Sequence, residues 1–327
     1  MNEGLLSPRF GSALASMLEQ FLQDKRARGC AYGREAYHLQ QLDRFLTEAG
    51  LAEAELPRSL AEQWLVRTVN CRPSTHRKRV VVLRQLATFL RLHGRSAYVP
   101  LLPWTPRKEL RSAARIFSRN EMRTLLDAAD HLPYNPRTPV RHLVVPELFR
   151  VLYGCGLRVG EARRLTVVDV DLASGVLHIL QGKHHRDRLV PVAPGLRRRL
   201  ERYANALGAR AANAPFFPAP QARHYGHQGI YRIFRELLER AGIIHGGRGQ
   251  GPRLHEIRHT FAVHRLEHWY LAGEDLNAKL PLLATYLGHR SLAGTQAYLQ
   301  LTQILFTELT INLDAVYGFV IPTESTL

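Results

Sequence analysis

Residues 254–262 read LHEIRHTFA and have the spacing of an amphipathic helix. Its apolar face is made by Leu254, Ile257 and Phe261. His255 and Arg258 are three residues apart and therefore share another face. An arginine and a histidine that project together offer a phosphate clamp and a proton donor or acceptor, which phosphoryl transfer without a metal requires. Taken alone, such a segment is more often a surface helix with incidental polar residues.

Three further segments carry residues of matching chemistry. They are GCGLRVGEARRL at 154–165 with Arg158, QGKHHRDRLVPV at 181–192 with Lys183, and LGHRSLAGTQAYL at 287–299 with His289 and Tyr298. Together with LHEIRHTFA, they resemble the tyrosine recombinase (phage integrase, Xer-like) family over roughly residues 113–305. Four segments in the family's order are a strong signal, whereas a lone tyrosine would carry no weight.

The resemblance implies a role for each matching residue. Tyr298 would be the nucleophile, Arg158 and Arg258 the phosphate-binding pair, Lys183 the proton donor to the departing 5′ oxygen, and His255 and His289 the assisting imidazoles. Glu161 resembles the family's acidic position and is expected to orient a neighbour rather than to transfer protons. The product would be a 3′-phosphotyrosine ester, which conserves the energy of the phosphodiester. No metal, ATP or other cofactor is therefore expected.

Elementary chemistry agrees with this assignment. The transition state gathers negative charge on the non-bridging oxygens, and two fixed guanidinium groups stabilise it more than the ground state. A tyrosine has a pKa near ~10, so its phenol must lose a proton as it attacks, helped by the cationic pocket and by His255. Tyr286 and Tyr270 are rival nucleophiles, but Tyr286 lies in the apolar run PLLATYL, which is typical of a core.

Two positions depart from the family pattern. The hairpin turn commonly reads GKG, whereas His184 replaces the second glycine here. This change puts the shape of the turn and the role of Lys183 in doubt, although Arg186 and Arg188 are poor general acids because guanidinium barely deprotonates. Gln300 stands near the place where the family often has a histidine after the tyrosine, and no catalytic consequence is expected.

The rest of the C-terminal half has mostly helical spacing, with one exception. The runs at 176–180 and 189–192 are short and β-rich and flank a polar turn, which predicts a hairpin. The loop at 241–252 is rich in glycine, but it contains no nucleotide-binding pattern. We therefore expect a mainly α fold with a small antiparallel β-sheet (α+β), arranged as a two-domain DNA clamp.

The N-terminal hundred residues predict helices alone. Helical spacing covers residues 14–28, 34–49, 60–69 and 75–92. The last of these has Ser74 as a candidate N-cap and Gly94 as a candidate stop. Arg77, Arg84 and Arg91 recur every seven residues on it, away from its apolar face. Such a stripe is often only a solvated helix face, but it is also a candidate DNA-binding surface.

A proline-rich and basic run, YVPLLPWTPRKELRSAA at 98–114, is typical of an interdomain linker. Ser118 followed by Glu121 is a capping-box pattern that opens the next helix. We therefore expect a helical N-terminal DNA-binding (core-binding) domain at 1–97, a linker at 98–113, and a catalytic domain with a C-terminal tail at 114–327.

The 327 residues carry 45 Lys and Arg against 28 Asp and Glu, a formal net charge of +17. The excess is +8 in residues 1–112 and +9 in 113–327, so both halves attract a polyanion.

Cys30, Cys71 and Cys155 are too few and too scattered for a disulfide framework. Neither a signal peptide nor an apolar run of the ~20 residues that span a bilayer occurs, so nucleic acid outranks membrane and a cytoplasmic location is expected.

Together these features predict a site-specific DNA recombinase whose partner is double-stranded DNA. The resemblance implies a homo-tetramer that exchanges strands between two DNA sites through a Holliday junction, with partner recombinases or accessory proteins as further candidates. Integration, excision, transposition, inversion and dimer resolution all stay open. So do an inactive DNA-binding accessory protein and a type IB topoisomerase-like enzyme. The apolar segment after Tyr298 is expected to dock on a neighbouring subunit or to fold back on its own domain.

Overall fold

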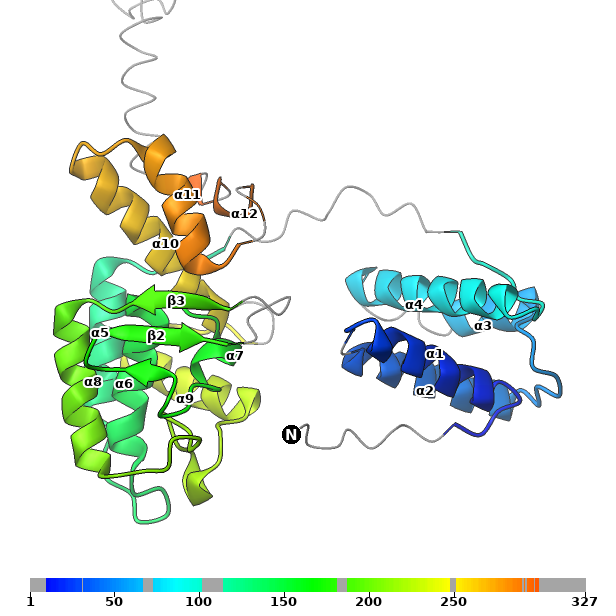
Figure 1. Ribbon diagram of the computed structural model, residues 1–327, viewed down its shortest axis with the longest axis horizontal. Helices are drawn as coiled ribbons and strands as arrows, with labels where there is room; N and C mark the ends of the chain where they lie inside the picture. Colours follow the sequence, from blue (N-terminus) through cyan, green and yellow to red (C-terminus); the bar gives the residue numbers. More distant parts are fainter. Residues whose placement is uncertain are drawn as a thin grey trace, which may run out of the picture. The chain divides into compact units, whose positions relative to one another are not determined.

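The protein is described by a computed structural model that covers residues 10–30, 32–66, 73–101, 114–180, 187–247 and 251–289, together with 291, 293–296, 298 and 299. The chain divides into two compact units, Met1–Leu110 and Arg111–Leu327. Each unit is described by itself. Both are built mainly from helices, as the sequence predicts (Figure 1).

The described part of unit 1 contains four helices. They are α1 (Ala15–Ala27), α2 (Gly33–Glu48), α3 (Arg58–Val66) and α4 (Pro73–Leu92). Their apolar faces meet in one core, in which Phe21, Leu39 and Leu86 are fully buried. Helix α4 begins at Pro73, so the expected N-cap, Ser74, lies inside the helix. A proline is well suited to the first turn because the N–H that it lacks has no partner there.

The segment after α4 returns to this core. Gly94 stops the helix with a φ of +72°, as expected. The Tyr98 N–H then donates to the Leu56 carbonyl oxygen at 2.9 Å, and the Tyr98 side chain packs against the core. The Arg84 guanidinium is half-buried and donates to the Pro100 carbonyl oxygen. Residues 98–100, which the sequence assigns to the linker, thus pack on unit 1.

Unit 2 consists of a small β-sheet and the helices that pack around it. Its helices are α5 (Arg119–Asp130), α6 (Arg141–Gly154), α7 (Val159–Ala162), α8 (Pro194–Leu207), α9 (His227–Arg240), α10 (Leu254–Leu271), α11 (Leu276–Leu287) and α12 (Ala293–Gln296), with the short 3-10 helix η1 (Pro220–Ala222). The strands are β1 (Val170–Asp171), β2 (Val176–Ile179) and β3 (Arg188–Pro191), in the antiparallel order β1-β2-β3. The predicted hairpin is confirmed, with Ile179 opposite Arg188, whereas β1 is an addition.

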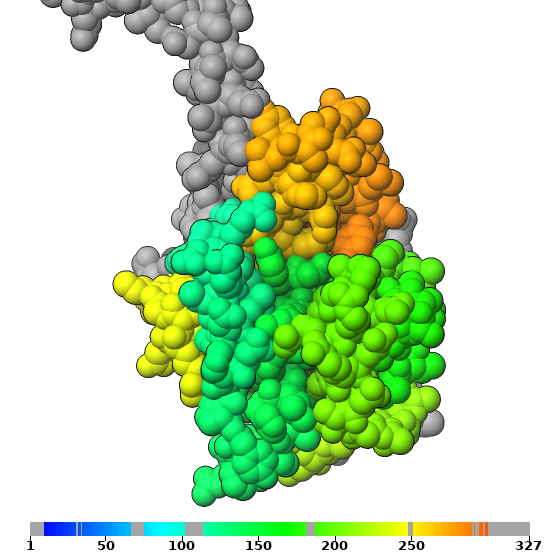
Figure 2. Space-filling model, turned by 90° about the vertical axis from the view of Figure 1, so that its left-hand side faces the viewer, coloured from blue at the N-terminus to red at the C-terminus, as the bar shows by residue number. Residues whose placement is uncertain are grey.

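The large core of unit 2 lies between the sheet and helices α5, α6, α8 and α9, and it includes Phe149 and Phe234. Ser118 and Glu121 form the expected capping box at the start of α5. A smaller cluster lies beside it, where Phe261, Leu266 and Leu287 pack α10 against α11. Helix α11 also contacts β3. Figures 1 and 2 show α11 and the C-terminal part of α10 at one end of unit 2.

Within the residues that the structure describes, no helix has both the length and the apolarity needed to span a bilayer. The same residues contain no cluster of three or more His, Cys, Asp or Glu side chains that could hold a metal ion. Cys30 is an exposed free thiol and Cys155 a buried one, whereas Cys71 lies outside the described residues.

Candidate active site

Arg258 lies at the centre of the candidate site and is 2% exposed. Its guanidinium donates to the Gly156 carbonyl oxygen at 2.8 Å and to the Leu287 carbonyl oxygen at 2.6 Å. These carbonyls follow α6 and end α11, where helix dipoles favour a cation. Burial, with the charge of Arg158, lowers the pKa of Arg258 to about 10, so it stays protonated at neutral pH. Arg258 is therefore buried, and the segment is not the surface helix that it would most often be if taken alone.

The C-terminus of α11 gathers two more arginines. Arg158 donates to the Gly288 carbonyl oxygen at 3.1 Å, and Arg188 donates to the Tyr286 carbonyl oxygen at 3.0 Å. With the bond from Arg258 to Leu287, three consecutive carbonyls are each bound by a different arginine. The last carbonyls of a helix lack partners within the helix. The helix end thus fixes three guanidinium groups side by side.

Glu161 ties two of these arginines together and is 4% exposed. One of its oxygens accepts from the Arg158 guanidinium at 2.7 Å, and Arg188 donates to both oxygens at 3.1 and 2.8 Å. The Arg158 backbone N–H adds a bond of 2.9 Å, which caps α7. Although burial favours the neutral acid, the bonds from Arg188 and Arg158 lower the pKa of Glu161 to about 2. Glu161 is an ionised anchor, in agreement with the expectation that it orients a neighbour.

Tyr298 lies beside Arg258 in the same chain and is 3% exposed. Burial raises the pKa of its phenol, while a hydrogen bond with Arg258 and the charges of Arg258 and Arg158 act in the opposite direction. The raised pKa keeps the phenol protonated at neutral pH. Its backbone N–H donates to the Thr295 carbonyl oxygen at 2.9 Å, which fixes the turn that follows α12. The structure thus brings the phenol and both predicted guanidinium groups together.

Two imidazoles pack against the phenol, and a third packs against one of them. The ring centroid of Tyr298 lies 5.8 Å from that of His289 and 5.4 Å from that of His259. His255 in turn packs against His259 at 4.6 Å. Nδ1 of His289 is 2.7 Å from the Thr295 hydroxyl oxygen, which holds the His289 ring against the phenol.

The surroundings keep two of these rings neutral. Burial against neighbouring groups, with the charges of His259 and Arg258, lowers the pKa of His255 to about 3, although part of this residue remains exposed. Burial and the charges of Arg258 and Arg158 lower the pKa of His289 to about 4. Neutral imidazoles can accept a proton or a hydrogen bond, which imidazolium ions cannot.

The remaining expectations divide into three groups. Lys183 and His184 lie outside the described residues, as does Gln300. The rival Tyr286 is half-buried, and its hydroxyl donates to the Pro191 carbonyl oxygen at 3.1 Å, as suits a structural residue. In unit 1, Arg77 and Arg91 are exposed on α4, whereas Arg84 is bonded to Pro100.

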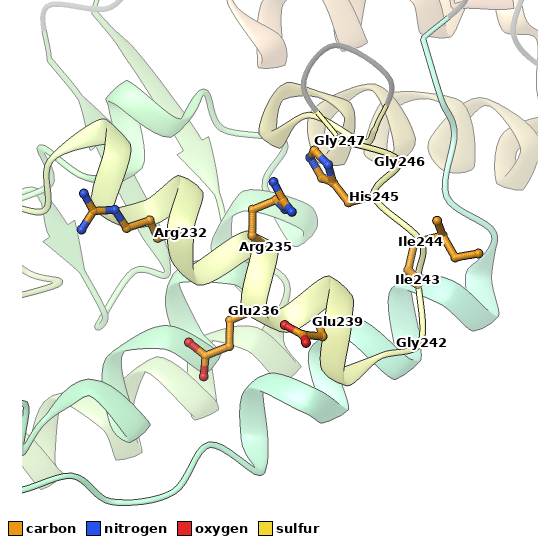
Figure 3. A pocket seen from close by; sticks show the side chains of 10 residues that line it. All are labelled: Arg232, Arg235, Glu236, Glu239, Gly242, Ile243, Ile244, His245, Gly246 and Gly247. Atoms are coloured by element: carbon orange, nitrogen blue, oxygen red, sulfur yellow. The ribbon is translucent and has the colours of Figure 1, made fainter.

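A cavity of about 690 Å³ lies elsewhere on unit 2, between the exposed face of α9 and the loop at 242–247 (Figure 3). Arg232, Arg235, Glu236 and Glu239 line it from the helix. It contains none of the described candidate residues. The candidate site is a cluster of buried charges against a buried phenol, and its chemistry, not the size of a cavity, identifies it.

Sequence reasoning missed two residues of this cluster. His259 is four residues after His255, which places both on one face of α10, and this spacing was a usable signal. The sequence alone marks Arg188 only as a poor general acid. It stands two residues before Val190, which is fully buried, so the alternation of a strand places Arg188 on the inner face. An arginine at such a position needs a buried partner, and Glu161 is that partner.

Comparison with known proteins agrees with this geometry. The model of the phage integrase family matches residues 115–303. The protein y4rB of Sinorhizobium fredii, named as an integrase/recombinase, is 31% identical over 301 residues, which cover 88% of this chain and 93% of y4rB. The tyrosine recombinase XerD of Rhizobium meliloti is 29% identical over 242 residues, 73% of this chain and 74% of XerD.

Solved structures share the fold. The crystal structure of the XerH site-specific recombinase bound to its difH substrate, in a post-cleavage complex, covers 90% of this chain and 84% of its own with a TM-score of 0.64 at 18% identity. The Tn1549 transposon integrase, in complex with a circular intermediate DNA, gives a TM-score of 0.58 at 15% identity and covers 86% of this chain and 94% of its own. Since the family model matches more than half of the chain and y4rB aligns with most of it, this chain belongs to the phage integrase family and is a tyrosine recombinase, an enzyme of site-specific DNA recombination.

Proposed function

We propose that Tyr298 is the nucleophile and that Arg158 and Arg258 hold the scissile phosphate during attack. In the first step, the Tyr298 oxygen forms a bond to phosphorus and the bond from phosphorus to the 5′ oxygen breaks. The DNA 3′ end is left as a phosphotyrosine ester. The reverse reaction with a new 5′ hydroxyl releases Tyr298, and the number of phosphoester bonds is unchanged. Neither step consumes ATP.

One observation carries this proposal: the buried phenol of Tyr298 lies within the electrostatic influence of the buried guanidinium of Arg258 in the same chain. Negative charge that develops on the phosphate would meet two guanidinium groups that are already fixed on backbone carbonyls and on Glu161. Preorganised charge of this kind stabilises the transition state without further rearrangement. The site of one chain therefore supplies both the nucleophile and the clamp.

Proton transfer in this reaction needs a base for the Tyr298 phenol and an acid for the departing 5′ oxygen. The phenol is protonated at rest, so a base must accept its proton as the bond to phosphorus forms. His259 and His289 pack directly against Tyr298, and His255 packs against His259. We assign this imidazole group the role of acceptor, with His255 acting next to His259. Lys183 remains the proposed acid for the departing 5′ oxygen, on the strength of its motif alone.

The larger assembly is also a proposal. Four copies of the chain on two DNA sites would exchange strands in pairs through a Holliday junction, as the family resemblance implies. Unit 1 would act as a core-binding domain, with Arg77 and Arg91 on the exposed face of α4 as phosphate contacts. Arg84 is a weaker candidate because its guanidinium is already bonded to Pro100. The segment from residue 300 onward, for which docking on a neighbour and folding back on its own domain are the two expectations, lies outside the described residues.

Covalent capture of DNA tests the proposal and does not require a known target. The protein is mixed with sheared DNA from its own genome in the presence of EDTA, denatured, and recovered with any DNA that is attached to it, which is then sequenced. We expect the native protein and Tyr286→Phe to capture a restricted set of sequences and Tyr298→Phe to capture none. Tyr286→Phe is the matched control because it removes a phenol oxygen from a structural tyrosine of the same unit.

The outcomes separate the alternatives. Capture by Tyr298→Phe would remove Tyr298 from the reaction. Binding without any capture by the native protein would indicate an inactive accessory protein. Capture of unrelated sequences, with relaxation of supercoiled plasmids that lack a cognate site, would indicate a topoisomerase-like enzyme.

A further inference from the structure

We infer that Arg188 is a positioning residue for this reaction. It would set the charge and the direction of Arg158 through Glu161, and it would hold the end of α11 from which His289 projects. The inference rests on the proposed role of Arg158 as a phosphate clamp. Arg188 itself would not touch the substrate.

The contacts of Arg188 leave its guanidinium fully engaged. Its Nε donates to the Tyr286 carbonyl oxygen at 3.0 Å, and its two terminal nitrogens donate to the two Glu161 oxygens at 3.1 and 2.8 Å. The side chain is only 11% exposed. A guanidinium that binds both oxygens of one carboxylate has its direction fixed, which an ammonium group cannot achieve. Arg188 therefore works as a rigid bridge between Glu161 and α11.

Arg188 also sets the net charge of the cluster. Glu161 alone beside Arg158 would form a pair without net charge, and such a pair attracts a phosphate poorly. With Arg188 on the same carboxylate, the three groups together carry one positive charge, and Arg158 keeps an attractive field. Glu161 remains ionised because its pKa is about 2. Arg188 thus offsets the negative charge of the anchor that orients Arg158.

Gly288 packs closely against Arg188. A Cβ atom at this position would lie 3.1 Å from a terminal nitrogen of Arg188, so the backbone passes directly over the guanidinium. Gly288 ends α11 with a φ of +66°, and His289 is the next residue. Arg188 also begins β3, and the proposed acid Lys183 precedes it by five positions in the sequence. One side chain thus links strand β3 to Glu161 and to the end of α11.

The test compares Arg188→Met with Arg199→Met. Arg199 is the matched control because it also pairs with a buried carboxylate, that of Glu147 at 2.8 Å, but it lies on α8 outside the candidate site. The probe is a nicked duplex that carries a sequence captured by the native protein, and the readout is the rate of covalent attachment in a single turnover. A second duplex has a methylphosphonate at the scissile position, in which a methyl group replaces one charged oxygen.

We expect Arg188→Met to slow attachment to the normal duplex about 10-fold to 100-fold, less than the loss of a donor that contacts the reacting phosphate itself. On the methylphosphonate the deficit should largely disappear, because less negative charge develops there and the field of Arg158 matters less. The attachment rate of Arg188→Lys should lie between those of the native protein and Arg188→Met, because lysine keeps the positive charge but loses the bidentate guanidinium. Arg199→Met should react at the native rate on both duplexes.

Hydrogen exchange provides a readout without DNA. Backbone amides of residues 286–289 should exchange faster in Arg188→Met than in the native protein, and they should be unchanged in Arg199→Met. Native attachment rates for Arg188→Met, or an equal deficit on both duplexes, would overturn the inference while leaving Tyr298 as the nucleophile. If the native protein captures no DNA at all, the proposed function fails, which is a different result.

Discussion

Arg258 combines nearly complete burial with a permanent charge, and two backbone carbonyls compensate for its loss of water. A lysine at this position would carry the charge on a compact ammonium group, which cannot reach the Gly156 and Leu287 oxygens and a phosphate at once. We expect Arg258→Lys to slow covalent attachment by on the order of 100-fold or more. The free energy of unfolding should fall by about 1–3 kcal/mol, because a buried carbonyl loses its donor.

Single-turnover attachment and urea denaturation measure these two effects. Arg265→Lys is the control, because Arg265 lies on the same helix but is exposed and packs over the rings of Phe261 and Trp269. It should change neither quantity appreciably. Attachment at the native rate by Arg258→Lys would show that a fork of donors is not needed at this position.

His289 gives the site a dependence on pH whose sign can be derived. Its pKa is about 4 in the folded protein, against an ordinary value of 6.5. As the pH falls below 6.5, the unfolded chain takes up a proton that the folded chain does not, so the folded state loses stability. The loss continues down to about pH 4, with a slope of at most about 1.4 kcal/mol per pH unit for one proton. Protonation of Glu161 lowers the stability of the folded state in a lower pH range, between pH 4.5 and about pH 2.

Urea denaturation of the DNA-free protein at several pH values tests this expectation. The difference in free energy of unfolding between the native protein and His289→Gln should shrink as the pH falls from 6.5 toward 4, because the variant lacks the titrating ring. A difference that stays constant over this range would mean that His289 titrates normally in the folded state.

At the residue scale, motifs in the sequence were enough to name Arg158, Arg258, His289 and Tyr298, which the structure brings into one cluster. The partners of these residues could not be read in the same way. The carbonyls that bind Arg258 belong to residues 102 positions before it and 29 positions after it, and carbonyls leave no trace in a sequence. Arg188 was overlooked for a related reason, since its value depends on a carboxylate 27 positions away.

Among the elements, the C-terminus of α11 organises the site most directly, and Gly288 is its critical residue. An alanine there would be strained at a φ of +66°, and its Cβ would press on the Arg188 guanidinium at 3.1 Å. Gly273, after α10, offers a matched control, because it has a φ of +70° and open space around the added atom. We expect Gly273→Ala to cost only the strain of the left-handed conformation, about 1–2 kcal/mol.

Gly288→Ala should lose more stability than Gly273→Ala, because it adds the displacement of Arg188 to the same backbone strain. Gly288→Ala should also slow covalent attachment, whereas Gly273→Ala should not. Thermal unfolding and single-turnover attachment give the two measurements. Equal behaviour of the two variants in both assays would contradict the idea that the close approach at Gly288 holds Arg188 in place.

The elements that periodicity could predict are the long ones. The helices of unit 1 occur within three residues of their predicted bounds, because apolar residues at helical spacing mark them clearly. The two-residue strand β1 is too short to show any alternation, and only its pairing with β2 creates it. Ser74 is not the N-cap of α4 that the sequence predicts, because the helix already includes Pro73.

At the scale of the whole molecule, the sequence predicted two parts, and the chain divides into Met1–Leu110 and Arg111–Leu327. Composition alone could not show that Tyr98 packs on unit 1, because this packing depends on Leu56, which is 42 positions earlier. What composition did show is a positive charge in both halves, +8 in residues 1–112 and +9 in residues 113–327.

DNA affinity should fall steeply with salt, because each phosphate contact releases counterions and contributes about 0.9 to the slope of log affinity against log salt. Arg77→Gln and Arg91→Gln, on the exposed face of α4, should each lower this slope by about 0.9. Arg84→Gln should lower it less and instead reduce stability, since the guanidinium is bonded to the Pro100 carbonyl. Arg44→Gln, an exposed arginine on α2, removes the same charge away from the stripe and serves as the control. Fluorescence anisotropy with a captured duplex over a salt series measures the slopes. If Arg44→Gln lowers the salt slope as much as Arg77→Gln does, unit 1 attracts DNA by its overall charge and α4 makes no defined phosphate contacts.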